Sequence, residues 1–573
     1  MCTILSAGIA LLAAALLLQR ISQRRSVVSR LPVAPAEEAS ILWGHEYKVF
    51  KGEVSAEYTR WAALLGQVFR IKTALFQGDR VRDRRRQSGS TAYFSGMYAD
   101  QRSSPKLSPT IIQNAYTYLK SQAFEPIVVK FVGRGVAWAE GEEHKFQRRL
   151  LVPAFTQVIV TSTTVAYEIP SYRLSAVKGM ADDVLQCAEK CASRLASELE
   201  AQEGISAGVF NLSLYIPACS LETICRVGFG RDFGYENSDV QAILGSWRED
   251  IQKFATFPAF LALRLIGMFP WIAKLPIPAV QEDGYAKKVI QRVAAELLKQ
   301  HSNPDGRDIF SILVRESWEV NFCFPFLHVL MPQTDRNSSV TVHPALQVAV
   351  VNMPLRMAGF ETSSGVVMFA LLDLARNTEA QTRLREELLA TELDWKTIEN
   401  LPYLDAVTRE SLRLHPSSAE THRIAICDDT IPLRWPVTLQ TGETITVLHP
   451  VLLQEFTIPY TLLNTNPAIW GPNALDFVPE RWMASNGVPL STDLPHGPWS
   501  NLSTFADGPR MCIGWRLGVM QVKTLLAVMV RTFEFKDTGA KVHKMLAPTL
   551  QPFVNGEAAM IPIHVSLAHS SRE

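Results

Sequence analysis

Apolar residues recur along much of this chain at intervals of three and four positions, the spacing of one face of an α-helix. Three long segments show this spacing with charged residues between the apolar ones, at 181–201, 286–300 and 365–389. Short apolar runs bounded by polar and turn-forming residues predict strands at 68–71, around Ile424 and Ile431, and at 444–447. The pattern predicts a mainly α-helical protein with small β-sheets.

The N-terminal segment differs, because residues 4–18 are apolar and carry no charge. Counted from the first residue, this segment just reaches the ~17 residues that a membrane-spanning helix needs. Positive charges follow it and keep that side in the cytosol. These charges are Arg20, Arg24, Arg25 and Arg30. We predict a transmembrane anchor at 1–20, a basic, proline-containing hinge at 21–40 and one domain at 41–573. A cleaved secretory signal is the alternative, but in such signals the charges precede the apolar run.

Composition narrows the class of protein. The 573 residues are 47% hydrophobic and 20% charged, which suits a globular core plus a membrane segment. The net charge of +1 gives no reason to expect a nucleic-acid partner. Eight cysteines are scattered without the paired spacing of a zinc site, which favours reduced thiols in a protein that faces the cytosol.

The most informative chemical feature is the loop Phe-Ala-Asp-Gly-Pro-Arg-Met-Cys-Ile-Gly, which begins at Phe505 and precedes an apolar helical run. A thiolate at the start of a helix is stabilised by N–H groups and can be an axial ligand of haem iron. Gly508 allows a tight turn, and Gly514 allows the backbone to pass close to a flat ligand. Arg510 can neutralise a cofactor carboxylate, and Phe505 can shield the sulfur from water. The simpler alternative for Cys512 is a small buried core thiol.

This loop resembles the haem-binding signature of the cytochrome P450 family, Phe-x-x-Gly-x-Arg-x-Cys-x-Gly, with all five fixed residues present. The resemblance implies the cytochrome P450 fold, one large helical domain behind the anchor. It also implies haem b, with Cys512 as the thiolate ligand of the iron. The residues at 463–472 and Trp482 are similar to those of fungal, microsomal members.

A second motif, Ala-Gly-Phe-Glu-Thr-Ser at 358–363, lies inside a long apolar helical pattern. A hydroxyl beside a carboxylate can relay the protons that O–O cleavage requires. The motif resembles the oxygen-binding stretch of the family's central helix, and this resemblance implies catalytic roles for Thr362 and Glu361. Taken alone, the pair also fits a hydroxyl bonded back to its own helix beside a solvated carboxylate.

Glu410 and Arg413 are three positions apart on one face of a predicted helix, where they form a local ion pair. Most such pairs are exposed and contribute little to stability. In the family, however, this Glu-x-x-Arg is a buried structural pair joined by a second arginine. Arg481, in the segment Pro-Glu-Arg-Trp, matches that arginine. The resemblance therefore implies a structural ion-pair role for Glu410, Arg413 and Arg481.

Two more arginines match family positions that hold haem propionates. Arg148 corresponds to the arginine of a Trp-x-x-x-Arg motif, with His144 in the tryptophan position. Arg423 corresponds to an arginine on a short strand below the cofactor. Guanidinium suits bidentate carboxylate binding, so the resemblance implies that Arg148, Arg423 and Arg510 bind the propionates. A solvated basic helix face is the alternative for Arg148.

Four stretches depart from the family pattern, at 78–112, 156–173, 318–355 and 448–458. Pro354 conflicts most directly with the resemblance, because proline inside the central helix costs about 3 kcal/mol or more and kinks it. The family pattern resumes after each stretch, so we hypothesise that some of them are mis-spliced, intron-derived sequence. Genuine loop insertion, which surface positions tolerate, is the alternative.

Together these features predict a haem-thiolate monooxygenase, an oxidoreductase that inserts one atom of O2 into a small apolar organic substrate. Because the chain has no flavin or dinucleotide fingerprint, electrons are expected from NADPH through a separate cytochrome P450 reductase. The resemblance also implies a lipid-anchored position in the endoplasmic reticulum membrane and a role in fungal secondary metabolism, terpenoids included. Two alternatives remain open: a reductase-independent haem-thiolate isomerase or dehydratase, and a catalytically impaired or mis-spliced haem-binding protein.

Overall fold

The computed structural model describes residues 27–66, 68–74, 90–94, 107–121, 135–155, 178–201, 207–269, 355–452, 454–483 and 497–568. Single positions are also described at 272, 275, 288, 292, 308, 309 and 311. The predicted anchor at 1–20 lies outside the described residues, as do the stretch at 156–173 and all of 318–355 except Leu355. Most of the helix predicted at 286–300 also lies outside them.

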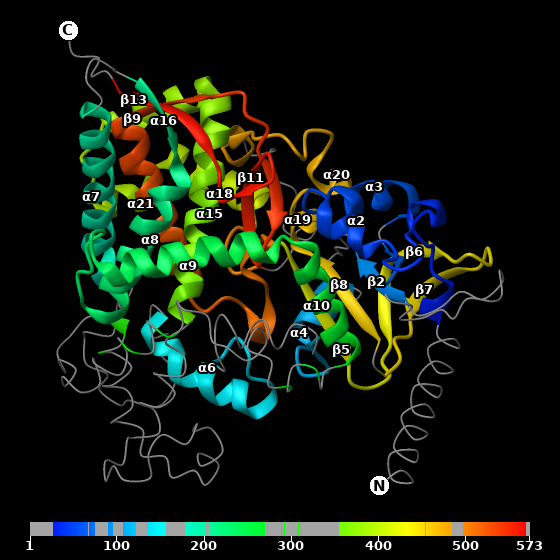
Figure 1. Cartoon of the computed structure of the whole chain (residues 1–573). Helices are drawn as coiled ribbons and strands as arrows, with labels where there is room; N and C mark the ends of the chain where they lie inside the picture. Colours follow the sequence, from blue (N-terminus) through cyan, green and yellow to red (C-terminus); the bar gives the residue numbers. More distant parts are fainter. Residues whose placement is uncertain are drawn as a thin grey trace, which may run out of the picture.

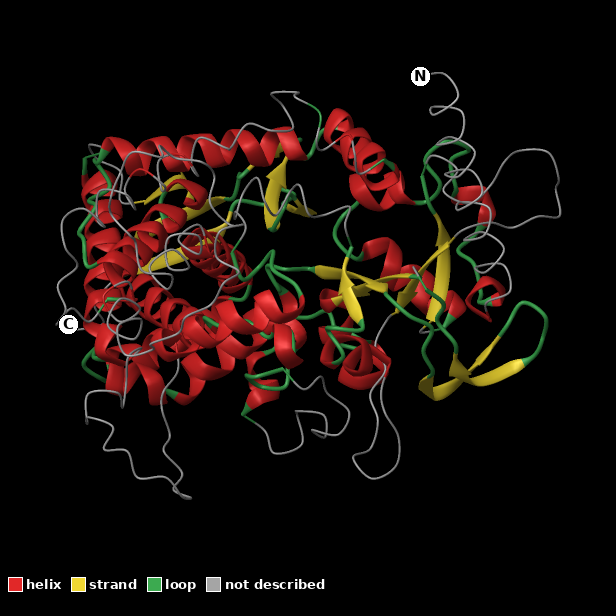
Figure 2. Cartoon of the chain, turned by 90° about the horizontal axis from the view of Figure 1, so that it is seen from below, coloured by secondary structure: helices red, strands yellow, loops and turns green. Residues whose placement is uncertain are grey.

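Helices make up most of the described structure, and the longest of them gather at one end of the molecule (Figure 1). The largest sheet lies toward the other end, as Figure 2 shows from below. The helices are α2 Glu46–Lys51, α3 Ala56–Leu65, α4 Leu107–Gln113, α6 Gly141–Phe155, α7 Ala181–Glu200, α8 Ile216–Phe229, α9 Ser238–Phe254, α10 Phe257–Met268, α15 Leu355–Arg376, α16 Thr378–Leu389, α17 Trp395–Asn400, α18 Pro402–Leu414, α19 Tyr460–Asn464, α20 Pro467–Trp470 and α21 Trp515–Thr532. The predicted mainly helical fold class with small sheets is confirmed.

The central helix of this arrangement is α15. From Val366 to Ala375 every residue except Asp373 is buried, because other helices surround it. α8 and α21 pack against α15, and apolar side chains of α7, α16 and α18 complete the same core. A helix enclosed on all sides must be apolar on all sides. This explains why, among the described residues, Ala358–Arg376 is the one helix with the length and composition of a membrane span while most of it is buried in protein.

The ends of α15 differ from the sequence prediction in one respect. The described helix begins at Leu355, directly after Pro354, which lies outside the described residues. It ends at Arg376, and Asn377 then caps α16 by accepting a hydrogen bond of 3.0 Å from the Ala380 N–H. The prediction of one continuous helix at 365–389 is therefore wrong, because the apolar period continues across a residue whose side chain starts a new helix.

The described strands form four small sheets. Their bounds are β1 Val68–Lys72, β2 Ser90–Phe94, β3 Tyr118–Lys120, β4 Ala207–Asn211, β5 Glu420–Ala425, β6 Ile431–Thr438, β7 Thr444–Leu448, β8 Glu455–Pro459, β9 Phe533–Asp537, β10 His543–Leu546, β11 Leu550–Val554, β12 Glu557–Ala558 and β13 Pro562–Leu567. β1, β5, β6 and β7 confirm the strands predicted from the sequence. The largest sheet has the order β1-β2-β8-β5-β3, and the others are β10-β11-β12, β4-β13-β9 and β6-β7.

Parts of two stretches that depart from the family pattern lie inside the largest sheet. β8 belongs to the stretch at 448–458, and β2 belongs to the stretch at 78–112. β8 pairs antiparallel with β5 and parallel with β2, and Phe456, Thr457 and Ile458 are fully buried. These two strands are therefore integral to the sheet that carries β5, not loops on its surface.

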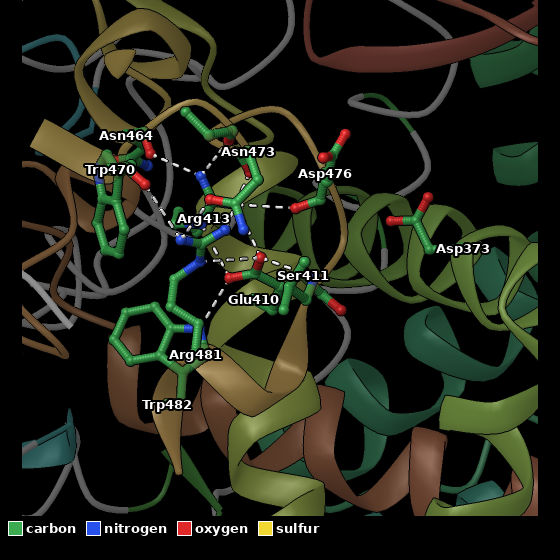
Figure 3. A network of polar contacts seen from close by, with 12 residues as sticks. Asp373, Glu410, Ser411, Arg413, Asn464, Trp470, Asn473, Asp476, Arg481 and Trp482 are labelled. Carbon is green, nitrogen blue, oxygen red and sulfur yellow. Dashed lines mark hydrogen bonds and ion pairs between the residues drawn. The ribbon is translucent and has the colours of Figure 1, made fainter. Parts of the chain in front are cut away.

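A buried charged network joins α18 to the segment that leads toward the cysteine loop (Figure 3). Arg413 donates two hydrogen bonds to the Glu410 carboxylate, from Nε at 2.9 Å and from Nη2 at 2.7 Å. Neither side chain has any exposed surface. Arg481 approaches the same carboxylate at 3.5 Å. The Glu410 carboxylate also accepts hydrogen bonds from the Val478 N–H at 3.0 Å and the Trp482 indole at 2.8 Å.

The remaining guanidinium donors are directed at backbone carbonyls. Arg413 donates to the carbonyl oxygens of Asn464 and Ala474, at 3.1 and 2.6 Å. Arg481 donates to those of Trp470 and Asn473, at 3.2 and 3.0 Å. A buried ion pair keeps a protein stable only when its hydrogen bonding is this complete. The structure thus brings together the three residues assigned to the structural ion pair.

Replacing Glu410 with glutamine should lower the free energy of unfolding by about 3–5 kcal/mol, because two buried guanidinium groups lose their counter-charge. Urea unfolding followed by circular dichroism measures the change. The matched control is Glu249→Gln, which removes an exposed carboxylate paired with Lys253 on α9 and should leave the unfolding midpoint unchanged. A loss of under about 1 kcal/mol for Glu410→Gln would contradict a structural role for the network.

Candidate functional site

The cysteine loop starts where the buried network ends. The backbone carbonyl of Asn464 accepts a hydrogen bond from Arg413. The side-chain amide of Asn464 accepts a hydrogen bond of 2.9 Å from the Ser503 N–H and donates one of 2.9 Å to the Thr504 hydroxyl. The Thr504 hydroxyl in turn donates to the Leu412 carbonyl of α18 at 2.6 Å. The short helix Ser503–Phe505, which opens the loop, is therefore fastened to α18 and to the end of α19.

The loop is closed by backbone contacts that require its glycine. The Cys512 N–H donates to the Phe505 carbonyl at 2.8 Å. Gly508 has φ +63°, and a Cβ atom there would lie 2.9 Å from the Cα of Gln113 in α4, so no other residue fits. Asp507 accepts a hydrogen bond of 2.6 Å from the Gly508 N–H and another from the Gln113 amide at 3.2 Å. Gly514 has φ −93° and precedes α21.

Cys512 lies at the entry to α21, has accessible surface and lines a cavity. Protein packed around the residue raises the pKa of its thiol by desolvation. The Gly514 N–H, which donates toward the sulfur, and the positive charge of Arg148 both oppose this rise, because each favours the thiolate. One N–H donor and one positive charge therefore favour an ionised sulfur at this position.

The cavity measures about 430 Å³ and lies between α15, α6, β5 and the first turns of α21. Much of its lining is apolar. These residues include Val136, Leu151, Phe155, Ile224, Val366 and Leu517. Phe505 also lines the cavity, and its ring lies 3.7 Å from the Cβ position of Gly518 on α21, beside the cysteine loop. The site is therefore an apolar chamber with Cys512 in its wall.

The structure separates the two residues of the central-helix motif. Thr362 lines the cavity, and its hydroxyl donates back to the Ala358 carbonyl at 2.6 Å. Its own carbonyl accepts a hydrogen bond of 2.6 Å from the hydroxyl of Ser417. Glu361 is not among the lining residues: it is buried and accepts a hydrogen bond from the Gln551 amide. Burial raises the pKa of Glu361 to about 7.

Basic side chains converge at one end of the cavity. Arg148 from α6, Arg423 from β5 and Arg510 from the cysteine loop all line it, so the structure brings together the three arginines that the sequence singled out. Burial lowers the pKa of each, to about 10 for Arg510. Arg510 is held by the Ala139 carbonyl at 2.6 Å and by an ion pair with Glu140.

Lys120 and His144 also belong to this basic end of the cavity. Of the two, Lys120 was not identified by the sequence analysis. Lys120 stands opposite Arg423 in the β3–β5 pairing, and burial together with Arg510 and Arg423 lowers its pKa to about 6. His144 is buried on α6, hydrogen-bonds the Tyr116 hydroxyl at 3.1 Å and has its pKa lowered to about 4 by burial and by neighbouring cations. Lys120 reaches the site through the register of β3 against β5, which no sequence motif predicts.

The residues present fit a flat dianionic cofactor with a thiolate-ligated metal. Nε and Nη1 of Arg423 and Nε of Arg510 are buried without a hydrogen-bond partner among the described groups. Buried donors are rarely left unpaired, and a carboxylate is the acceptor that guanidinium prefers. Haem propionates would supply such acceptors, while Cys512 would supply the sulfur ligand to the iron.

Comparisons with known proteins agree with this geometry. The family model for cytochrome P450 matches residues 111–557. The cytochrome P450 monooxygenase claQ of Ampulloclitocybe clavipes is 27% identical over 547 residues, which cover 93% of this chain and 92% of that protein. Cytochrome P450 monooxygenase 128 of Postia placenta is 29% identical over 475 residues, covering 78% and 79%. Since the family match spans well over half of the sequence, the chain belongs to the cytochrome P450 family of haem-thiolate monooxygenases.

Proposed function

We propose that this protein is a haem-dependent monooxygenase that uses O2 and electrons from NADPH to oxidise an apolar organic substrate. One observation carries the proposal: the Cys512 thiol, the Thr362 hydroxyl and unpaired guanidinium nitrogens of Arg423 and Arg510 border one apolar cavity. When bound, haem would supply the oxygen chemistry, placing one atom of O2 in the substrate and reducing the other to water. The protein's own residues hold the cofactor, exclude water and manage protons.

Each of these residues has a role that follows from its position. Cys512 would be the iron ligand, and the Gly514 N–H would stabilise its charge. Arg148, Arg423 and Arg510 would bind the propionates, with Lys120 as a further cation. Thr362 and Ser363 are the hydroxyl residues of α15 that line the cavity. Of these, Thr362 would hand protons to the reacting oxygen, and Glu361 behind it would hold them in reserve.

The partners and location are part of the same proposal. Electrons would reach the site from a separate NADPH–cytochrome P450 reductase. The apolar segment at 4–18 would anchor the protein in the endoplasmic reticulum membrane with the domain in the cytosol. The apolar lining supports a small lipophilic substrate, and the fungal origin of the relatives supports a role in secondary metabolism, terpenoids included.

Replacing Cys512 with alanine should abolish thiolate ligation, because no other cysteine is among the described residues that line the cavity. The measurement is the reduced, carbon-monoxide-bound difference spectrum of the full-length protein. Wild type should show a strongly red-shifted Soret band, and the variant should not. The matched control is Cys427→Ala, which removes an exposed thiol outside the cavity and should keep the band. Absence of the band in wild type would reject the proposed function.

Replacing Arg423 or Arg148 with leucine should speed haem loss about tenfold or more, because each guanidinium contributes a charge-assisted hydrogen bond of about 1.5–3 kcal/mol. Transfer of haem to excess apomyoglobin measures the rate. Arg149→Leu is the matched control, since Arg149 is the exposed neighbour of Arg148 on α6 and does not line the cavity. Equal rates for Arg148→Leu and Arg149→Leu would contradict the propionate role of Arg148.

Replacing Thr362 with alanine should leave haem content and the Soret band intact but divert reducing equivalents to hydrogen peroxide, because the cavity loses this hydroxyl on α15. The ratio of peroxide formed to NADPH consumed is measured in a reconstituted system with reductase. Thr362→Ser keeps a hydroxyl and should restore most of the coupling. Full coupling in Thr362→Ala would remove Thr362 from proton delivery.

A further inference from the structure

Glu361 occupies a buried compartment beside α15 and is not among the residues that line the cavity. Its side chain lies among α15 itself, α9 and β11, and only 3% of the residue is exposed. Its neighbour Phe360 is fully buried and meets Trp247 of α9 edge to face, with ring centroids 5.9 Å apart. A carboxyl group buried to this extent depends on its protein neighbours for hydrogen bonds.

Gln551 contacts Glu361 although the two residues are 190 positions apart in the sequence. Its amide nitrogen donates to a carboxyl oxygen of Glu361 and to the Thr549 hydroxyl, the latter at 2.7 Å. Gln551 is 1% exposed. The nearby Trp247 indole also favours the carboxylate form of Glu361. Among the described residues, the polar groups that act on the Glu361 carboxyl are these two uncharged side chains, and no charged side chain acts on it from α9, α15 or β11.

The strand that carries Gln551 is tied to the cavity wall. The Leu550 N–H donates to the Ser417 carbonyl at 2.9 Å, and the Ser417 hydroxyl donates to the Thr362 carbonyl at 2.6 Å. A Cβ atom at Gly365 would lie 3.5 Å from both the Leu550 carbonyl and the Ser417 hydroxyl. The start of β11 therefore packs closely on α15 one turn after Glu361, which fixes Gln551 relative to Thr362.

We propose that Gln551 is a positioning residue for Glu361: its amide holds the carboxyl group in the buried compartment and sets the proton affinity with which that group serves the cavity. This inference rests on the proposed function, in which Glu361 is the proton reserve behind Thr362. Rotation of the Glu361 side chain toward Thr362 requires the hydrogen bond from Gln551 to break. β11 thereby controls when the acid is available.

The inference has a consequence that does not depend on turnover. Burial raises the pKa of Glu361 from its ordinary value to about 7, and the neighbouring side chains of Trp247 and Gln551 oppose that rise because they favour the carboxylate. The folded protein thus keeps a proton that the unfolded chain loses at lower pH. Stability contributed by this group is present below the ordinary glutamate pKa and is lost as the pH rises toward 7.

The test is the pH dependence of thermal unfolding of the full-length holoprotein in detergent, followed by circular dichroism from pH 5 to 9. Removing the amide donor in Gln551→Leu should raise the pH at which the decline in stability ends by about one unit, because a hydrogen bond to the carboxylate is lost in the folded protein. Glu361→Gln should abolish this part of the decline. In Glu361→Gln, adding Gln551→Leu should produce no further change in the pH profile.

A matched control separates positioning from general destabilisation. Gln381 is another buried amide, which donates to the Leu374 and Phe535 carbonyls far from Glu361, so Gln381→Leu should lower stability equally at every pH. If Gln551→Leu does not fold, Thr549→Val removes the second partner of Gln551 and should give a smaller shift in the same direction. An unshifted profile in Gln551→Leu, or an equal shift in the Glu361→Gln background, would overturn the proposal.

Failure of this inference is distinguishable from failure of the proposed function. The carbon-monoxide spectrum of wild type and of Gln551→Leu reports the haem-thiolate site independently of Glu361. A red-shifted band in both proteins together with an unshifted stability profile would reject the role of Gln551 and leave the proposed function standing. A wild-type protein without that band would reject the proposed function, on which the role of Gln551 depends.

Discussion

The buried carboxylate of Glu410 is the constraint on which the haem side of this protein depends. Arg413 and Arg481 converge on it, and their remaining donors take up the backbone carbonyls of the segment that follows α19. Because an unpaired charge in the interior is costly, this segment cannot move without breaking several hydrogen bonds together. Asn464 and Leu412 are both hydrogen-bonded to Thr504, so the same network also holds the loop that carries Cys512.

The basic end of the cavity follows the opposite principle, since cations outnumber carboxylates among the described residues that line the cavity. Glu140 pairs with Arg510 and Lys120, yet Arg148 and Arg423 crowd the same space. Burial and this crowding lower the pKa values of Lys120 and His144. A dianionic group bound among them would relieve the repulsion and raise both pKa values, so the same side chains that destabilise one another would favour such a ligand.

α15 connects these features because its side chains lie in two different environments. Thr362 lines the cavity, whereas Glu361 lies in a buried compartment formed by α9 and β11. A carboxyl group kept from water holds its proton to a higher pH than an exposed one. Adjacent residues on one helix thus acquire separate tasks through the elements that pack against each face.

The sequence alone determined the cysteine loop and the local pair of Glu410 and Arg413, because each depends on residue types at short, fixed spacing. The family and the part played by Arg481 came from the resemblance that these motifs carry. The pattern at 358–363 identified Thr362 and Glu361, but not that they face different compartments, since helical periodicity says nothing about which neighbour covers which face. Lys120 and Gln551 carried no local signal. Their positions follow from the pairing of β3 with β5 and from the packing of β11 against α15, contacts between residues 190 or more positions apart. Burial and pairing across such distances set the charges and hydrogen bonds of the site, and only the tertiary structure decides them.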